Sequence, residues 1–213
     1  MKSRFFLISI ILCISSCSLE EDSGYYSDSF GVVKPSGNNS LYIKSDKGEI
    51  LIPNQNISSF VTAGDRVWIS YTVEKENVNR DTLIILPYRI TNVMPLTLQT
   101  STTLNNTGVD MWTIWVAQGF LTFDFRIRAK DPEKLKEHEY ALVSLQKEIK
   151  DTLFIDFFHD DGGDNYGVLC RTAVTLKLSD LKIANDSVTI VVDYKDLHGI
   201  KQTEYQMYKK NQN

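Results

Sequence analysis

Hydrophobic residues alternate with polar residues along most of the chain after residue 30. The pattern is clearest at residues 65–73 (DRVWISYTV), 120–128 (FLTFDFRIR) and 187–194 (SVTIVVDY). A period of two is typical of β-strands that bury one face. Runs rich in Gly, Asn and Asp separate the strands, at residues 34–39 (KPSGNN), 45–48 (SDKG) and 160–165 (DDGGDN). The pattern therefore predicts an all-β protein of short strands joined by tight turns.

One segment, residues 131–150, carries two periods at once. Asp131, Pro132 and Glu133 form a typical helix start, and leucines recur beyond them at helical spacing. Residues 141, 143 and 145 also alternate as in a strand. We expect a short helical turn at 132–136 followed by a strand at 138–146. A helix over 137–146 is the alternative.

A polar stretch at residues 99–107 (QTSTTLNNT) divides the predicted strands into two groups. The first group, over residues 30–98, suits a small five-stranded Greek-key barrel of the oligonucleotide/oligosaccharide-binding (OB) type. The second group, over residues 99–213, holds six or seven strands and suits an antiparallel β-sandwich. The sequence thus predicts two all-β domains.

The first sixteen residues have the features of a secretory signal. Lys2 and Arg4 precede ten apolar or small residues at 5–14. That run is shorter than the roughly 20 residues that span a bilayer, and it is typical of a signal peptide. Residues 14–17 (ISSC) resemble a bacterial lipoprotein box, which implies cleavage after residue 16 and acylation of Cys17, for example with palmitate. An ordinary secretory signal cut elsewhere is the alternative.

Loss of the signal changes both the charge and the cysteine count. Without Lys2 and Arg4 the chain holds 21 basic and 27 acidic residues, a net charge of −6. This charge argues against nucleic acid as a partner, because phosphate neutralisation drives such binding. Cys170 is then the only cysteine besides Cys17, so no internal disulfide can form. Alternation along residues 170–178 predicts that its thiol is a small buried hydrophobe.

Four stretches carry a resemblance to a known family. They are residues 64–73 (GDRVWISYTV), 112–127 (WTIWVAQGFLTFDFRI), 138–143 (HEYALV) and 157–167 (FFHDDGGDNYG). With the signal, the chain resembles the NigD-like lipoproteins of Bacteroidetes. The resemblance implies an OB-type barrel and a C-terminal β-sandwich behind a lipidated tether at residues 17–29. The family has no established activity, but its name derives from a bacteriocin gene cluster, which implies an immunity role for at least one member.

Residue types that could support catalysis or metal binding are present without a recognisable pattern. The turn at 160–164 places three aspartates near His159, which could suit calcium, although a plain hairpin turn is the favoured interpretation. His138, His159 and His198 lack the spacing of zinc ligands, and no GxSxG motif occurs. We therefore predict no catalytic residues, no metal and no cofactor.

Tryptophans are the better candidates for ligand contact. Trp68 shares the polar face of its strand with Arg66, Ser70 and Thr72. An aromatic ring there could stack a ligand, as in OB-type modules, or could pack against the second domain. Trp112 and Trp115 fall on opposite faces of a regular strand, so we expect at least one of them in the core.

Two further features resemble modification and export signals of Bacteroidetes. Thr82, Thr152 and Ser187 each lie between an aspartate and an aliphatic residue, which resembles an O-glycosylation acceptor. Turn-into-strand chemistry selects the same residues and is the alternative. Glu20, Glu21 and Asp22 follow Cys17 as an acidic run that resembles a surface-export signal. We expect an outer-membrane lipoprotein displayed at the cell surface, with periplasmic retention as the alternative.

These features predict a lipid-anchored envelope protein without enzymatic activity. We expect a binding or scaffold module whose partner is a glycan, a peptide or an envelope protein. The alternative is a bacteriocin-immunity-type protein that neutralises a toxin at the envelope. A hydrolase with converging carboxylates is the third hypothesis.

Overall fold

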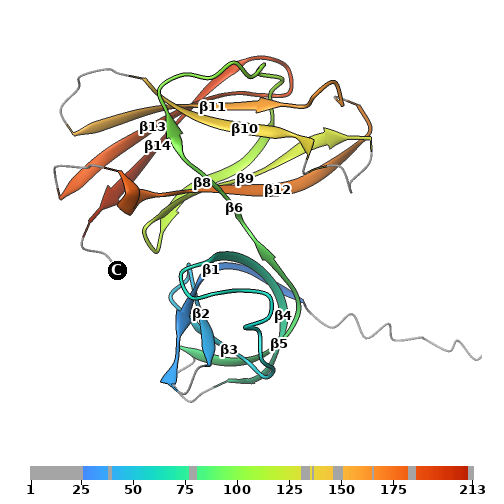
Figure 1. The fold of residues 1–213 in the computed structure, drawn as a ribbon, viewed down its shortest axis with the longest axis vertical. Coiled ribbons are helices and arrows are strands. Elements are labelled where there is room, and N and C mark those ends of the chain that lie inside the picture. The colour runs from blue at the N-terminus through green and yellow to red at the C-terminus, as the bar shows by residue number, and fades with distance from the viewer. Residues whose placement is uncertain are drawn as a thin grey trace, which may run out of the picture.

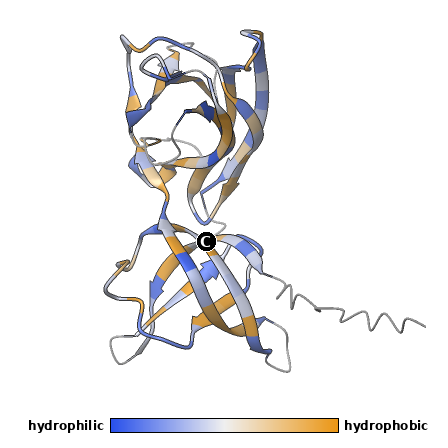
Figure 2. Ribbon diagram, turned by 90° about the vertical axis from the view of Figure 1, so that its right-hand side faces the viewer, coloured by the Kyte–Doolittle hydropathy of each residue, from blue (hydrophilic) through white to orange (hydrophobic). Residues whose placement is uncertain are grey.

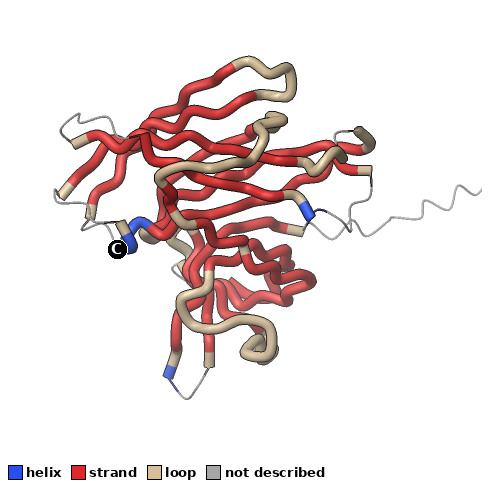
Figure 3. Tube along the Cα trace, turned by 45° about the horizontal axis from the view of Figure 1, so that its top comes forward, coloured by secondary structure: helices blue, strands red, loops and turns tan. Residues whose placement is uncertain are grey.

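The protein consists almost entirely of β-strands, arranged in two parts that Figure 1 and Figure 3 show stacked one above the other. The computed structural model describes residues 26–37, 40–76, 81–130, 135, 137–145, 151–164, 166–181 and 186–210. Cys17, Glu20, Glu21 and Asp22 lie outside these residues. In the described part of the chain, no helix has the length and apolar character needed to cross a membrane.

The N-terminal part is a closed five-stranded barrel. Its strands are β1 (Ser27–Pro35), β2 (Leu41–Ser45), β3 (Ile50–Pro53), β4 (Arg66–Glu76) and β5 (Thr82–Asn92). They are ordered β1-β2-β3-β5-β4, and pairing of β1 with β4 closes the barrel. Alternate residues such as Val67, Ile69 and Tyr71 fill its core. The prediction of an OB-type barrel is confirmed.

The C-terminal part is a sandwich of two sheets. The five-stranded sheet has the order β14-β13-β11-β10-β7, with β14 at Lys201–Lys209, β13 at Ser187–Lys195, β11 at Thr152–Asp160, β10 at Glu139–Leu145 and β7 at Leu98–Gln99. The four-stranded sheet has the order β6-β12-β9-β8, with β6 at Met94–Leu96, β12 at Val168–Lys177, β9 at Phe120–Ala129 and β8 at Asp110–Ala117. A 3₁₀ turn at Leu178–Asp180 follows β12.

The sandwich core follows the alternation in the sequence, which Figure 2 shows along the strands. Leu121, Phe123, Phe125 and Ile127 of β9 are fully buried against the opposite sheet. The predicted sandwich is confirmed, although the pairs β6–β12, β7–β10 and β11–β13 are parallel. β10 also settles the ambiguous segment, because residues 139–145 form a strand. Most of the expected helical turn, residues 132–134 and 136, lies outside the described residues.

The chain passes from barrel to sandwich earlier than the polar stretch at 99–107. β6 pairs with β12 at Val174–Leu176, and β7 pairs with β10. Residues 94–98, which the sequence analysis assigned to the barrel, therefore complete the two sheets of the sandwich. The polar stretch runs beside β11 instead, where the Thr107 amide donates to the carbonyl of His159 at 2.9 Å. Whether the two parts behave as separable units stays a prediction.

Candidate functional site

The polar face of β9 is turned toward the barrel rather than toward solvent. Thr122 and Asp124 point away from the sandwich core, yet both are buried. Arg66, at the start of β4, is only 4% exposed. A buried guanidinium is tolerated where charged and hydrogen-bonding partners surround it. β4 of the barrel and β9 of the sandwich therefore meet through polar side chains that point away from the two cores.

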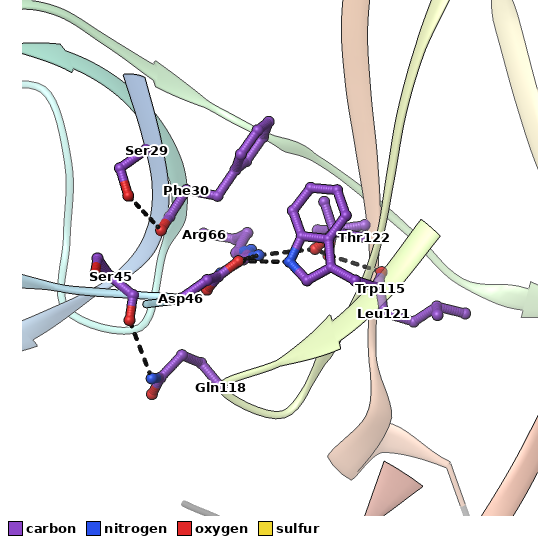
Figure 4. Close-up of polar contacts among 10 residues, drawn as sticks. Ser29, Phe30, Ser45, Asp46, Arg66, Trp115, Gln118, Leu121 and Thr122 are labelled. Carbon is purple, nitrogen blue, oxygen red and sulfur yellow. Dashed lines mark hydrogen bonds and ion pairs between the residues drawn. The ribbon is translucent and has the colours of Figure 1, made fainter. Parts of the chain in front are cut away.

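An aspartate of the barrel joins the two domains, as Figure 4 shows. Asp46, in the turn between β2 and β3, accepts hydrogen bonds at 2.5 Å from Nη1 and Nη2 of Arg66. The same carboxylate accepts from the indole Nε1 of Trp115, at 2.6 Å. Nη2 of Arg66 also donates to the hydroxyl of Thr122, at 2.9 Å. We refer to Asp46, Arg66, Trp115 and Thr122 as the Asp46 clasp.

Aromatic rings surround the clasp. The Phe30 ring stacks on Trp68 with centroids 5.5 Å apart, and it meets the Trp115 ring edge-on at 5.0 Å. Val93 and Ala173 complete this small apolar cluster between the domains. The guanidinium of Arg66 lies 5.9 Å from the Phe30 ring centroid, a range at which cation–π attraction operates. The junction thus combines apolar burial with a desolvated ion pair.

A row of alternating tryptophan and arginine side chains extends from the clasp to the surface. Cζ of Arg171 lies 4.4 Å from the ring centroid of Trp68 and 4.8 Å from that of Trp112. Cζ of Arg126 lies 4.8 Å from the Trp112 centroid. We refer to Trp68, Arg171, Trp112 and Arg126 as the Trp–Arg stack. Of its two indoles, Trp112 is the more accessible, with 49% of its surface exposed.

Carboxylates already pair with both arginines of the stack. Arg171 donates from Nε and Nη2 to Asp124, at 2.9 and 2.6 Å. Arg126 donates from Nε and Nη2 to one oxygen of Asp110, at 2.8 and 2.5 Å. Hydrogen bonding to Asp124 raises the pKa of Arg171 above its ordinary value, and burial opposes this rise. The stack therefore presents an apolar ring held by neutralised cations, not a free positive charge.

A β-bulge explains why Trp112 reaches this surface. The pairing of β8 with β9 shifts between Met111 and Thr113, so Trp112 is the extra residue. A bulge adds one residue to a strand and so changes which face the following side chains occupy. Trp112 and Trp115 consequently both lie on the outer side of the sheet, against the arginines and the barrel. Neither ring therefore enters the core of the sandwich, but Trp115 packs against the smaller buried cluster of Phe30, Val93 and Ala173, so one of the two does contact a core.

The other predicted site residues are dispersed. Trp68 is half-buried between Phe30 and Arg171, contacts that favour the packing interpretation over ligand stacking at that ring. Thr82, Thr152 and Ser187 are each the first residue of a strand and follow an exposed aspartate. Ser187 is exposed and the two threonines are half-buried. The structure does not bring these three residues together.

Cys170 does not become the fully buried hydrophobe that alternation predicted. It lies near the start of β12, at the end of the sandwich, and is half-buried. Burial raises the pKa of its thiol, and the charge of Asp164 adds to the rise. Both effects disfavour the thiolate, the form that reacts as a nucleophile.

Backbone amide groups donate hydrogen bonds to the carboxylates of the acidic turn. The amides of Gly162 and Asn105 donate to Asp160, and the amide of Gly163 donates to Asp161. These bonds are typical of a hairpin turn. Within the residues described, no group of three or more His, Cys, Asp and Glu side chains is placed to hold a metal ion.

Sequence analysis missed one close pair of titratable residues. Nδ1 of His138 lies 2.9 Å from Nε2 of His159, and both side chains are buried. Their separation of 21 positions is not a metal-type spacing. The β10–β11 register, which pairs Tyr140 with His159, makes the two histidines diagonal neighbours. Predicting that register would have been the signal that found them.

Solved structures with a similar fold come from Bacteroides and Parabacteroides species. A NigD-like immunity protein from Bacteroides caccae is 21% identical, with a TM-score of 0.65 over 84% of this chain and 91% of that one. A candidate toxin-related protein from Parabacteroides distasonis is 20% identical, with a TM-score of 0.64 over 87% and 94%. A candidate lipoprotein from Bacteroides fragilis is 14% identical, with a TM-score of 0.64 over 88% and 100%. At these identities the likeness concerns the fold alone.

The sequence itself is matched at the level of the family. No curated protein matches the chain. The family described as the NigD-like C-terminal beta sandwich domain matches residues 92–208, a range that begins at the last residue of β5 and covers nearly all of the sandwich. The chain therefore belongs to the NigD-like family.

Proposed function

We propose that the protein is a lipid-anchored, non-enzymatic binding module of the bacterial envelope that engages its partner through the Trp–Arg stack. The exposed ring of Trp112 is the observation that carries this proposal. Tryptophan and arginine are the residue types most enriched among the side chains that dominate binding energy at interfaces. Solved structures of similar fold are described as a NigD-like immunity protein, a candidate toxin-related protein and a candidate lipoprotein, which is compatible with a binding role.

The geometry of the stack favours a partner with apolar or sugar-like surface. Asp124 and Asp110 neutralise the two guanidinium groups, so little free charge remains for an anion. The indole of Trp112 is 49% exposed, and it can contact a partner at little cost in conformational entropy, because the arginines already hold it. Either a peptide segment of an envelope protein or the apolar face of a sugar ring could cover it.

Affinity capture tests the proposal. Residues 24–213, without the lipid, serve as bait in envelope extract. We expect Trp112→Ala to weaken capture about 30-fold, since dominant interface residues contribute 2 kcal/mol or more. Tyr205→Ala is the matched control, because Tyr205 is an exposed aromatic residue on β14, at the edge of the other sheet. Equal capture by both variants would place the binding surface elsewhere.

The membrane attachment is part of the proposal. The ISSC sequence at residues 14–17 supports lipidation of Cys17, and Glu20, Glu21 and Asp22 support export to the outer surface of the outer membrane. The likeness to a candidate lipoprotein is compatible with such an anchor. O-glycosylation at Thr82, Thr152 or Ser187 is a further proposal, and exposed Ser187 is the most accessible of the three.

Bacteriocin immunity is the second candidate function. The likeness in fold to a NigD-like immunity protein is the observation that favours it. An immunity protein needs a partner interface of standard size, well over 1,000 Å² in total. Deletion of the gene should then sensitise cells to a toxin that neighbouring cells secrete, whereas a scaffold protein should be captured with envelope components of its own cell.

A further inference from the structure

A chain of hydrogen-bonding groups crosses the end of the sandwich farthest along β9 from the Asp46 clasp. It begins at the carbonyl of Gly108, before β8, which lies 3.0 Å from Nδ1 of His159. Nε2 of His159 lies 2.9 Å from Nδ1 of His138. Nε2 of His138 lies 3.8 Å from Oδ2 of Asp164, in the turn between β11 and β12. Three segments that are distant in the sequence, at Gly108, at His138 and at residues 159–164, therefore meet through two imidazole rings.

The carbonyl of Gly108 determines where the protons lie. A carbonyl only accepts hydrogen bonds, so Nδ1 of His159 carries a proton. The hydroxyl of Thr107 lies 3.2 Å from the same Nδ1, but its one proton goes to the backbone carbonyl of His159, at 3.0 Å, so the hydroxyl oxygen can only accept from Nδ1. Neutral His159 then has a bare Nε2, which accepts the proton of His138 Nδ1. Neutral His138 consequently has a bare Nε2 of its own.

That bare nitrogen faces another acceptor. Within the described residues, Nε2 of His138 is buried without a hydrogen-bond partner, and the carboxylate of Asp164 is the group it faces. A buried acceptor opposite a carboxylate is unfavourable, because neither group can donate. One proton on Nε2 of His138 turns this contact into a charge-assisted hydrogen bond to Asp164.

The proton that faces Asp164 lies on His138 whichever ring carries the charge. A proton on Nε2 of His159 is accepted by a bare Nδ1 of His138, 2.9 Å away, and His138 then carries its own proton on Nε2. Burial lowers the pKa of His159, which keeps that ring neutral, and the nearby charge of His138 acts in the same direction. The hydrogen bond to Gly108 and the charges of Asp161 and Asp160 oppose this shift.

Other titratable groups surround the pair on every packed element. On β10 the Tyr140 ring stacks on His159 at 5.4 Å, and burial raises the pKa of Tyr140, so its hydroxyl stays neutral. On β9, Arg128 shares with His159 and Asp161 the lining of a surface hollow of about 300 Å³. The charge of Asp160 acts on His159, Glu137 precedes His138 in the chain, and the Cys170 thiol lies near Asp164. Carboxylates outnumber cations here, which favours uptake of one proton by the pair.

We propose that His138 and His159 form a proton-operated latch. Uptake of one proton by the pair places a hydrogen on Nε2 of His138, which then donates to Asp164 and holds the 161–164 turn against the sandwich. The other carboxylate oxygen of Asp164 accepts the Lys130 amide at 2.9 Å, so the latch also holds the end of β9. Histidine changes charge in the range from about pH 5 to 8. The contact is present in acid and is lost as the pH rises, because the neutral pair holds no proton on Nε2 of His138 that Asp164 could accept.

Hydrogen exchange of the full mature chain tests the latch. The amides of Lys130 and Asp164 report on the turn, since the first bonds to Asp164 and the second to the Asp161 carbonyl. After correction for intrinsic rates, we expect their protection to rise about tenfold between pH 8 and pH 5.5, the effect of one hydrogen bond to a charged group. His198→Gln, which alters the exposed histidine outside the chain of bonds, should leave this rise unchanged.

A second variant and a direct measurement keep the test independent of folding defects. The amide of Asp164→Asn can donate to bare Nε2 at every pH, so this variant should show high protection without pH dependence. Nitrogen NMR of the wild type at pH 8 should show His138 protonated on Nδ1 alone. A proton on Nε2 at pH 8, or a wild-type pH dependence in Asp164→Asn, would overturn the latch.

Discussion

Asp46 of the barrel accepts hydrogen bonds from Arg66 of its own domain and from Trp115 of the sandwich, through one carboxylate. This single side chain neutralises a buried cation and joins the domains. Replacement by Ala would leave Arg66 buried and unpaired. Breaking a buried pair costs about 3–5 kcal/mol, so we expect Asp46→Ala to lower the free energy of unfolding by about 3 kcal/mol. Urea denaturation measures the change. Glu76→Ala, at an exposed acid at the end of β4, should change it by less than about 0.5 kcal/mol.

Trp115 and Trp112 provide a matched pair of substitutions to phenylalanine. Trp115→Phe removes the indole donor to Asp46 but keeps an aromatic ring in the junction. A hydrogen bond to a charged group contributes about 1.5–3 kcal/mol, so this change should destabilise by about 2 kcal/mol. Trp112→Phe removes an indole whose described contacts are with arginine faces, and should cost less than about 1 kcal/mol. Similar losses in the two variants would contradict the assigned role of Trp115.

The start of the sandwich can be tested with two fragments. Leu96 and Leu98 pack against the sandwich core from β6 and β7. A fragment of residues 93–213 keeps both strands, whereas 99–213 loses them. Burial of an aliphatic side chain contributes about 1.5–3 kcal/mol, so 93–213 should be more stable by about 2–4 kcal/mol. Thermal melts of the two fragments give the comparison.

Limited proteolysis of the whole chain should cut the loops before any strand of the barrel.

Lipidation of Cys17 is testable in cells. Labelled palmitate should mark the wild-type protein and leave Cys17→Ala unmarked, because Cys17 is the cysteine of the ISSC sequence. Cys170→Ala is the control and should be labelled like the wild type. Label that persists in Cys17→Ala would place the lipid on another residue.

We expect surface display to depend on the acidic residues after Cys17. Protease added to intact cells should degrade the wild-type protein. The triple change Glu20→Ala, Glu21→Ala and Asp22→Ala should leave the protein lipidated and abundant but protected. Protection of the wild type on intact cells, together with degradation in lysed cells, would show a periplasmic protein.

Period-two alternation was sufficient to predict the strands and both cores. Residues such as Phe123 and Ile69 stand at the apolar positions of alternating runs, and both are fully buried. It failed at the junction. Arg66, Thr122 and Asp124 read as solvent-facing, yet the barrel and the sandwich bury these outer faces against each other. Polarity along one strand does not show which other surface will cover it. The bulge at Trp112 and the contact between His138 and His159 depend on strand register, which alternation does not specify.

Asp28 contacts Arg171 close to the point where the chain enters the barrel. Asp28 is the second residue of β1 and lies 3.8 Å from an arginine of the sandwich, so β1 begins beside the junction of the two domains. Cys17 precedes Asp28 by 11 positions, and eleven residues span at most about 40 Å. A lipid on Cys17 would therefore tether the molecule by its middle. The far ends of the barrel and of the sandwich would then lie on opposite sides of the attachment point. The Trp–Arg stack, beside the junction, would lie closer to that point than either far end.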